Sequence, residues 1–270
     1  MEHRTEPLPT RSLGALLDET FAIYGRHLRR LVWIAALVQA PATLLSAGVL
    51  EIWGSHLGTA IAIGLIWVLA FVIVGAAAIS AVGQHYLTGN VDVRGCYTRA
   101  FWRARSLALV ALIAATMVLL VPAMLWAVGV SGVAAYVILL LVPLTAMFLY
   151  WSMAIQVMIV EGHEALGALG RSFTLVKGSW RRVLGVWSIV VLVAFGLSIM
   201  ITVPFLAVSI PLGPGHFAAA GVRFLNNVAV ATGVPLVIFI SGTLLYYDLR
   251  VRKEQYNVGA LAREMGMFAV

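Results

Sequence analysis

The chain has 270 residues, of which 62% are hydrophobic and 11% are charged, and its formal net charge at pH 7 is +7. This composition lies far outside the range of water-soluble domains and predicts an all-α polytopic membrane protein without a separate soluble domain. The basic residues flank apolar stretches instead of forming one run or stripe, which argues against a nucleic-acid-binding protein.

Six apolar stretches follow one another along the chain, over residues 31–50, 59–82, 107–128, 133–160, 183–210 and 224–247. Each has at least the roughly 20 residues that a helix needs to cross the hydrocarbon core of a bilayer. All Lys and Arg residues except Arg223 fall before the first stretch, after the last, or in the second and fourth connections. The positive-inside rule therefore predicts six transmembrane helices with both ends of the chain in the cytoplasm.

Three of the predicted cytoplasmic segments, 12–30, 91–106 and 163–182, have the apolar spacing of amphipathic helices. The first carries a stripe through Leu13, Leu17, Phe21, Tyr24, Leu28 and Leu31, and the third a stripe through Leu166, Leu169, Phe173, Val176, Trp180 and Val183. The middle segment has a weaker stripe, and residues 248–270 form a basic cytoplasmic tail. The stripes fit two interpretations, because either the floor of the helix bundle or the acyl boundary of the membrane would satisfy them.

In the second interpretation, basic side chains near the predicted span ends lie among anionic lipid headgroups. The candidate headgroup contacts are Arg29, Arg30, Arg105, Arg181, Arg182, Arg250 and Arg252. Arginine suits this position because its long stem can stay in the apolar layer while the guanidinium reaches the headgroups.

The predicted spans contain almost no ionisable residue, which argues against a proton- or sodium-coupled pump. Four amide side chains do lie inside them, Gln39, Gln156, Asn226 and Asn227. They predict either ordinary hydrogen bonds between helices or a polar path between helices that proline kinks. Convergence of the four amides on one cavity would favour the path.

No arrangement typical of an enzyme is present in the sequence. The acidic and histidine cluster Glu161, His163 and Glu164 has too few ligands for a zinc site, and acidic residues at a helix start already favour the helix dipole. No glycine-rich phosphate loop follows a strand. We therefore predict a protein without catalytic activity, metal or cofactor, in which the single cysteine, Cys96, has no special role.

Two cytoplasmic segments carry a family resemblance. Residues 246–254 read Tyr-Tyr-Asp-Leu-Arg-Val-Arg-Lys-Glu, and residues 165–180 contain an Arg-Ser, aromatic, Leu-Val, basic-Gly pattern. Together with residues 13–24, they resemble the membrane domain of glycerophosphoryl diester phosphodiesterases. The resemblance implies a stand-alone multipass module without the catalytic barrel of that family, in a bacterial or archaeal plasma membrane.

The favoured hypothesis is a noncatalytic membrane protein that organises lipids or protein partners at the cytoplasmic face of the plasma membrane. Its expected partners are lipids with anionic headgroups and, as a further option, another membrane protein; nucleic acid is not expected. The alternative is a permease or lipid transporter with a polar path between kinked helices. An intramembrane enzyme is a third class, which would require polar residues clustered at one depth.

Overall fold

The computed structural model describes residues 9–113, 116, 145–213 and 217–266, and these residues form helices and no strand. The helices are α1 (Leu13–Arg26), α2 (Leu28–Trp53), α3 (Leu57–Thr88), α4 (Val93–Trp102), α7 (Ala154–Val160), α8 (Ala165–Val176), α9 (Trp180–Leu212), α10 (Phe217–Glu254) and α11 (Val258–Glu264). Two short apolar helices, Ala104–Ile113 and Thr145–Val160, border the undescribed part, and the second of them ends in α7. The all-α prediction is therefore confirmed for the described residues.

Among the described residues, four helices are long and apolar enough to cross a membrane: α2, α3, α9 and α10. They contain the predicted stretches 31–50, 59–82, 183–210 and 224–247. Of the remaining stretches, 107–128 lies largely outside the described residues and 133–160 is described only from residue 145, so a count of six spans stays a prediction.

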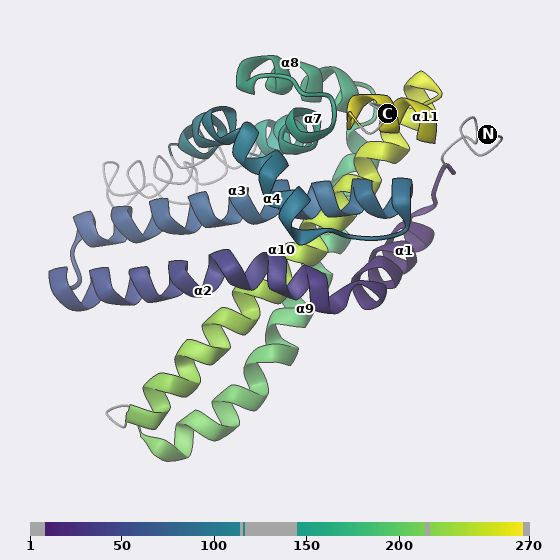
Figure 1. The fold of residues 1–270 in the computed structure, drawn as a ribbon. Helices are drawn as coiled ribbons and strands as arrows, with labels where there is room; N and C mark the ends of the chain where they lie inside the picture. The colour runs from purple at the N-terminus through teal and green to yellow at the C-terminus, as the bar shows by residue number, and fades with distance from the viewer. Residues whose placement is uncertain (1–8, 114–115, 117–144, 214–216, 267–270) are drawn as a thin grey trace, which may run out of the picture.

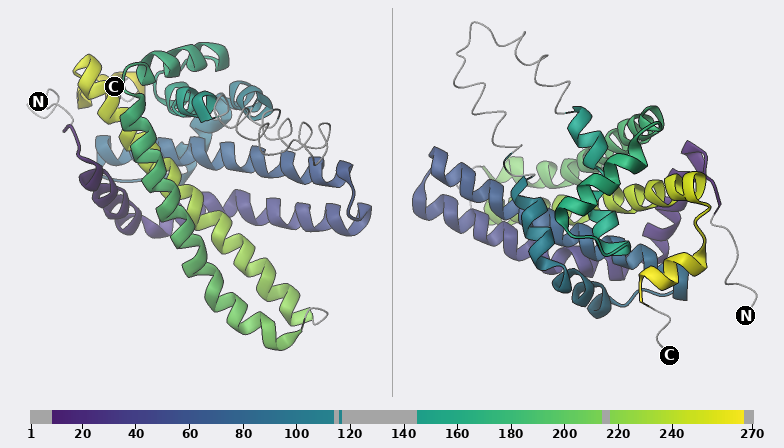
Figure 2. Two further views of the ribbon diagram at one scale, coloured as in Figure 1. Left: turned by 180° about the vertical axis from the view of Figure 1, so that it is seen from behind. Right: turned by 90° about the horizontal axis from the view of Figure 1, so that it is seen from above.

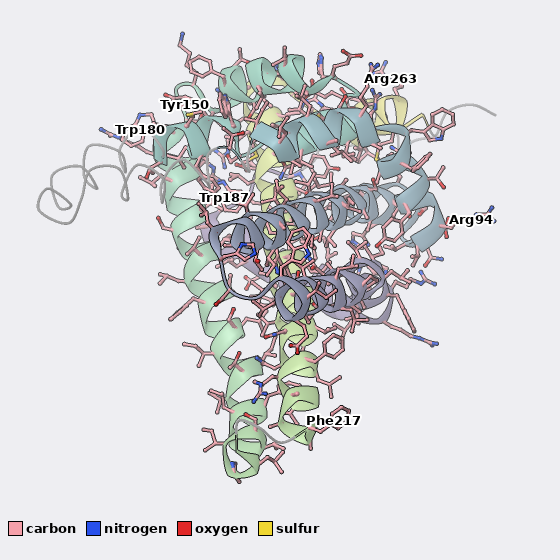
Figure 3. The ribbon with its side chains drawn as sticks, turned by 90° about the vertical axis from the view of Figure 1, so that its left-hand side faces the viewer. Arg94, Tyr150, Trp180, Trp187, Phe217 and Arg263 are labelled. Atoms are coloured by element: carbon pink, nitrogen blue, oxygen red, sulfur yellow. The ribbon has the colours of Figure 1, made fainter. Side chains whose placement is uncertain are left out.

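The four long helices form two hairpins, α2–α3 and α9–α10, which diverge from a common crossing region (Figure 1). The start of α1 and the end of α10 lie together, because the Arg11 backbone N–H donates a 2.8 Å hydrogen bond to Asp248. We call this the inner end of the bundle. Helices α8 and α11 lie toward this end in both views of Figure 2, whereas the turns of the two hairpins lie away from it. Figure 3 shows the side chains from a third direction, with Arg263 near the inner end of the bundle and Phe217 at the opposite end.

Helix α10 is the centre of the described bundle, where it contacts α9, α2, α3 and α1. Every residue from 239 to 250 is buried, so this stretch is enclosed on all sides. Helix α1 runs along it and shares a 3.1 Å hydrogen bond between Thr20 Oγ1 and Ser241 Oγ. On another side, Gly75 of α3 allows the ring of Phe239 to approach closely, since a Cβ at Gly75 would lie 2.3 Å from that ring.

Helix α1 packs against the bundle through a face that the sequence pattern did not single out. Its buried residues are Leu16, Thr20 and Ile23. From the predicted stripe, Leu13, Phe21 and Leu28 are exposed. The prediction of one apolar face was therefore incomplete, because α1 buries one side in the protein and leaves several large apolar side chains on the outside.

Helix α8 also divides its apolar side chains between the protein and the outside. It buries Ala168, Leu175 and Val176, of which Val176 belongs to the predicted stripe, while Leu166 and Phe173 of that stripe are exposed. Small residues such as Ala168 let helices approach closely, and the exposed large apolar residues lie where lipid can cover them.

Residues 248–270 do not form a separate tail where they are described. Helix α10 continues to Glu254, and the chain then turns so that α11 contacts α3. Met265 lies against Gly83, where a Cβ would be 2.3 Å from the methionine sulfur. The end of the described chain is thus part of the bundle.

Candidate functional site

Asp248, on α10, joins three parts of the chain at the inner end. Its side chain is fully buried and accepts hydrogen bonds from Arg182 Nε at 2.8 Å and Arg252 Nε at 2.9 Å, in addition to the Arg11 backbone N–H. Arg182 and Arg252 also donate to the Arg11 carbonyl oxygen. Both guanidinium groups donate to Oδ2, and the Arg11 backbone N–H donates to Oδ1. A buried carboxylate with two charged donors is stabilised well, and here it fixes the chain before α1 to the ends of α9 and α10.

Two residues further along α10, Arg250 forms a second buried cluster. Its guanidinium donates to both oxygens of Glu264, at 2.7 and 3.0 Å, and to Glu254 at 2.9 Å. It also stacks 3.7 Å from the ring centre of Tyr256, whose hydroxyl donates to Glu264 at 2.6 Å. Burial and the hydrogen bond to Glu264 raise the pKa of Tyr256, so this hydroxyl remains a donor. The cluster holds α11 against α10.

The residues that resembled a metal-ligand cluster belong to the same network. Glu161 accepts hydrogen bonds from the Tyr246 hydroxyl at 2.8 Å and from Arg171 Nε at 2.9 Å, while His163 Nε2 lies 3.5 Å from it. Although burial lowers the pKa of Arg171, its hydrogen bonds with Glu161 and Glu254 raise that pKa overall. The Glu161 carboxylate therefore ties α7 and α8 to α10.

The candidate headgroup arginines divide into two groups. Arg182, Arg250 and Arg252 donate to carboxylates of the protein, and Arg250 is only 7% exposed. By contrast, Arg29, Arg30, Arg105 and Arg181 are exposed. Within this second group, Arg30 donates to the Asn90 side chain and Arg105 lies 3.3 Å from the exposed carboxylate of Glu164.

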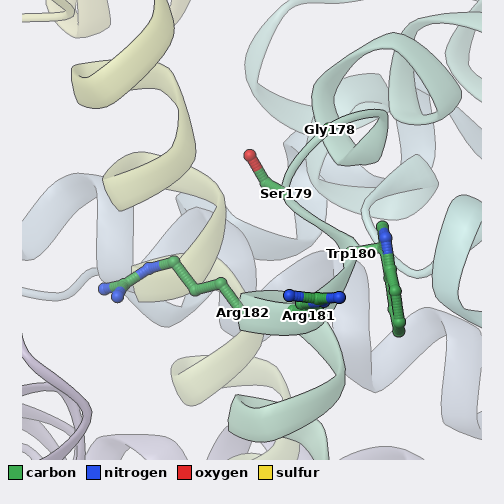
Figure 4. A pocket seen from close by; sticks show the side chains of 5 residues that line it. All are labelled: Gly178, Ser179, Trp180, Arg181 and Arg182. Carbon is green, nitrogen blue, oxygen red and sulfur yellow. The ribbon is translucent and has the colours of Figure 1, made fainter.

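A shallow pocket of about 470 Å³ lies at the start of α9 and is lined by residues 178–182. The Arg181 guanidinium lies 5.5 Å from the ring centre of Trp180, whose side chain is also exposed. Figure 4 shows Arg181 beside Trp180, while Arg182 extends away from them toward α10. Two neighbouring arginines at one helix start thus have different environments, one facing outward beside an aromatic ring and one bound to Asp248.

The four amides are not joined by a hydrogen bond in the described structure. Gln39 on α2 and Gln156 on α7 are buried, Asn226 is half-buried and Asn227 is exposed. Gln156 fills the space beside Gly242, where a Cβ would lie 2.9 Å from its Nε2. Its place between α7 and α10 fits helix contact, whereas Gln39 Oε1 and Asn226 Oδ1 are buried without a hydrogen-bond partner.

No family model, no curated protein and no solved structure matches the chain. The resemblance to the membrane domain of glycerophosphoryl diester phosphodiesterases therefore stays a prediction. The functional argument below rests on the arrangement of the residues.

Proposed function

We propose that this protein is a noncatalytic multipass membrane module whose inner end binds lipids with anionic headgroups. The observation that carries the proposal is the pair formed by Trp180 and Arg181, in which an exposed indole ring and an exposed guanidinium lie together at the end of a long apolar helix. Tryptophan prefers the interface between membrane and water, and arginine there is attracted to anionic headgroups.

The outward faces of the short helices support the same role. Leu13 and Phe21 on α1, Leu166 on α8, and Phe101 on α4 are exposed although they are large and apolar. Exposed apolar side chains beside arginines are typical of helices that lie in the membrane interface. The buried faces of α1 and α8 hold these helices to the bundle, so such faces would form a fixed surface for lipid.

The proposed topology has six spans, both ends of the chain in the cytoplasm, and the anionic inner leaflet of a bacterial or archaeal plasma membrane against the inner end. It is supported by the four long apolar helices and by the distribution of Lys and Arg. In the other form of this proposal, a protein partner binds to the same surface.

A permease or lipid transporter is the second candidate, because α2 carries a buried polar stripe. Gln39, Thr43 and Ser46 follow helical spacing and are buried, and Gln39 Oε1 and Ser46 Oγ have no hydrogen-bond partner. Buried polar oxygens of this kind fit a path that is wetted in another state. The lipid-binding role is favoured because the described structure does not connect this stripe with the amides of α7 and α10.

The test is native mass spectrometry of the protein released from nanodiscs that contain equal amounts of phosphatidylglycerol and phosphatidylcholine. Arg181→Gln should lower the retention of phosphatidylglycerol about five-fold, since each basic residue near an anionic surface contributes about 1 kcal/mol. Arg223→Gln, the same change at the opposite end of the α9–α10 hairpin, is the matched control and should leave retention unchanged. Equal retention in the parent and in Arg181→Gln would contradict the proposal.

A further inference from the structure

A larger pocket, of about 560 Å³, lies at a different place, between α4, the turn that follows α7 and the end of α11. Its lining includes three arginines of one short helix and its C-terminal flank: Arg94, Arg99 and Arg103. Like the pocket at the start of α9, it is shallow and open to solvent. None of the arginines of the proposed lipid-binding surface lines it.

The two carboxylates at this pocket already have partners. Asp92 accepts hydrogen bonds from the backbone N–H groups of Arg94 and Gly95, at 3.2 and 2.8 Å, and so caps α4. Glu264 accepts both donors of Arg250 from the opposite side. Both carboxylates therefore already have hydrogen-bond partners. With three arginines and two carboxylates in its lining, the pocket has a net positive charge.

The arginines, in contrast, have unused donors. The side chains of Arg94 and Arg103 form no hydrogen bond or ion pair with any residue in the described part of the chain, and Arg99 donates from Nη2 to the Met265 carbonyl oxygen at 2.7 Å. Arg99 is half-buried and has no carboxylate partner there, and burial lowers its pKa. Arg103 is half-buried as well, whereas Arg94 is exposed. A half-buried cation without a carboxylate partner has lost part of its hydration, so an anion that enters the pocket would gain charged hydrogen bonds there.

The turn after α7 brings Arg103 into position. Gly162 has a φ of +80°, which glycine adopts without strain, and a Cβ at this residue would lie 2.6 Å from Arg103 Nη2. A side chain here would therefore push the guanidinium out of its place. Trp102 forms an open rim, because its side chain is 82% exposed.

We infer that this pocket binds a phosphomonoester. Three guanidinium groups offer more planar donor pairs than the two oxygens of a carboxylate can accept, whereas a phosphomonoester has three terminal oxygens and nearly two negative charges at neutral pH. The same chemistry is found on a soluble sugar or glycerol phosphate and on the headgroup of phosphatidic acid. The inference does not depend on the proposed lipid-binding surface, because different residues form the two sites.

The experiment measures equilibrium binding to the full chain in phosphatidylcholine nanodiscs, with glycerol 3-phosphate and inorganic phosphate as soluble probes. A parallel series replaces a few per cent of the lipid by phosphatidic acid and follows its retention by native mass spectrometry. The variants are Arg94→Gln and Arg103→Gln, each of which should weaken binding about ten-fold or more, as expected for loss of a charged hydrogen bond. Arg103→Lys keeps a charge but not the planar fork, so it should bind with intermediate affinity.

Arg263→Gln is the matched control, since Arg263 is exposed on α11 and does not line the pocket. Binding of the soluble probes that weakens in Arg94→Gln and Arg103→Gln but not in Arg263→Gln would support a soluble ligand. The same pattern with phosphatidic acid alone would support a lipid ligand. Absence of binding to both sources, or equal binding by the parent and both glutamine variants, would overturn the inference. Phosphatidylglycerol retention, which tests the Arg181 surface, is read separately, so either proposal can fail without the other.

Discussion

Helices α9 and α10 are the two arms of one hairpin, and they differ in how much of each the protein covers. The most apolar windows of the two helices have similar mean hydropathy, 2.6 for α9 and 2.2 for α10. Yet 11% of the α9 window is buried in the described structure, compared with 67% of the α10 window. Hydropathy thus identifies both helices as candidate spans but does not tell which of them lies at the centre of the bundle.

The two helices also differ in the side chains that they present. Helix α9 carries large apolar residues such as Leu192, Phe195 and Met200 on its outer side, and all three are exposed. Helix α10 has small residues, including Ser241 and Gly242, at its contacts with neighbouring helices. Lipid chains are as apolar as leucine, so helices in a membrane associate through close contact of small and polar residues instead of through apolar surface alone.

At the inner end, the charged residues of α10 and α9 also differ in how far the protein covers them. The α10 residues Asp248 and Arg250 form buried ion pairs, whereas Arg181 of α9 faces outward beside Trp180. Basic residues near the ends of spans therefore serve two purposes in this protein. Some complete the bundle, and others, such as Arg181, are exposed on its outside.

The largest effect is expected from Asp248→Asn at the inner end of α10. The substitution keeps the shape but removes the negative charge that binds Arg182 and Arg252. Removal of one partner from a buried ion pair typically lowers the free energy of unfolding by about 3–5 kcal/mol. Unfolding in mixed micelles would measure this loss, with Asp18→Asn on the exposed side of α1 as the control. Similar stability of the two variants would show that the Asp248 junction does not hold the bundle together.

A pair of leucine truncations tests the contrast between α9 and α10 directly. Leu244 on α10 is 0% exposed, and Leu192 on α9 is 68% exposed. Leu244→Ala should cost about 2–5 kcal/mol because it leaves a cavity in protein. Leu192→Ala should cost less than about 1 kcal/mol, since fluid lipid can fill the space. The same unfolding measurement serves for both, and equal losses would mean that α9 is covered by something other than lipid.

The sequence alone was sufficient to predict the long helices. Apolar length predicted α2, α3, α9 and α10, and small residues such as Gly75 and Ala78 of α3 are buried at helix contacts, where close approach requires them. Both observations depend on local properties, namely the number of consecutive apolar residues and the size of their side chains. Such properties can be read without knowing which helices are neighbours.

The partners of the charged residues could not be predicted in the same way. Arg11 and Asp248 are 237 positions apart in the chain. The positive-inside rule places every arginine at an inner span end on the cytoplasmic side, and it does not distinguish between arginines that have different partners. An aspartate directly after the predicted span 224–247 was the available signal, because a charge at that place requires partners if it is buried. The contact faces of α1 and α8 were predicted only in part, because large apolar residues lie on both sides of these helices: Leu16 and Leu175 are buried, whereas Phe21 and Leu166 are exposed.

The smallest expected effect concerns Gly75, where α3 touches the buried arm of the hairpin. Gly75→Ala places a Cβ 2.3 Å from the Phe239 ring, which must shift, and such overpacking typically costs about 1–3 kcal/mol. Gly64→Ala on the same helix meets no atom within 4 Å and should be neutral or stabilising by up to about 1 kcal/mol, because alanine favours helix more than glycine does. Phe239→Leu combined with Gly75→Ala should recover part of the loss by removing the atoms that clash. If the two alanine variants were equally stable in the unfolding assay, α3 would not lie in close contact with α10, and the central position of α10 would have to depend on its other neighbours.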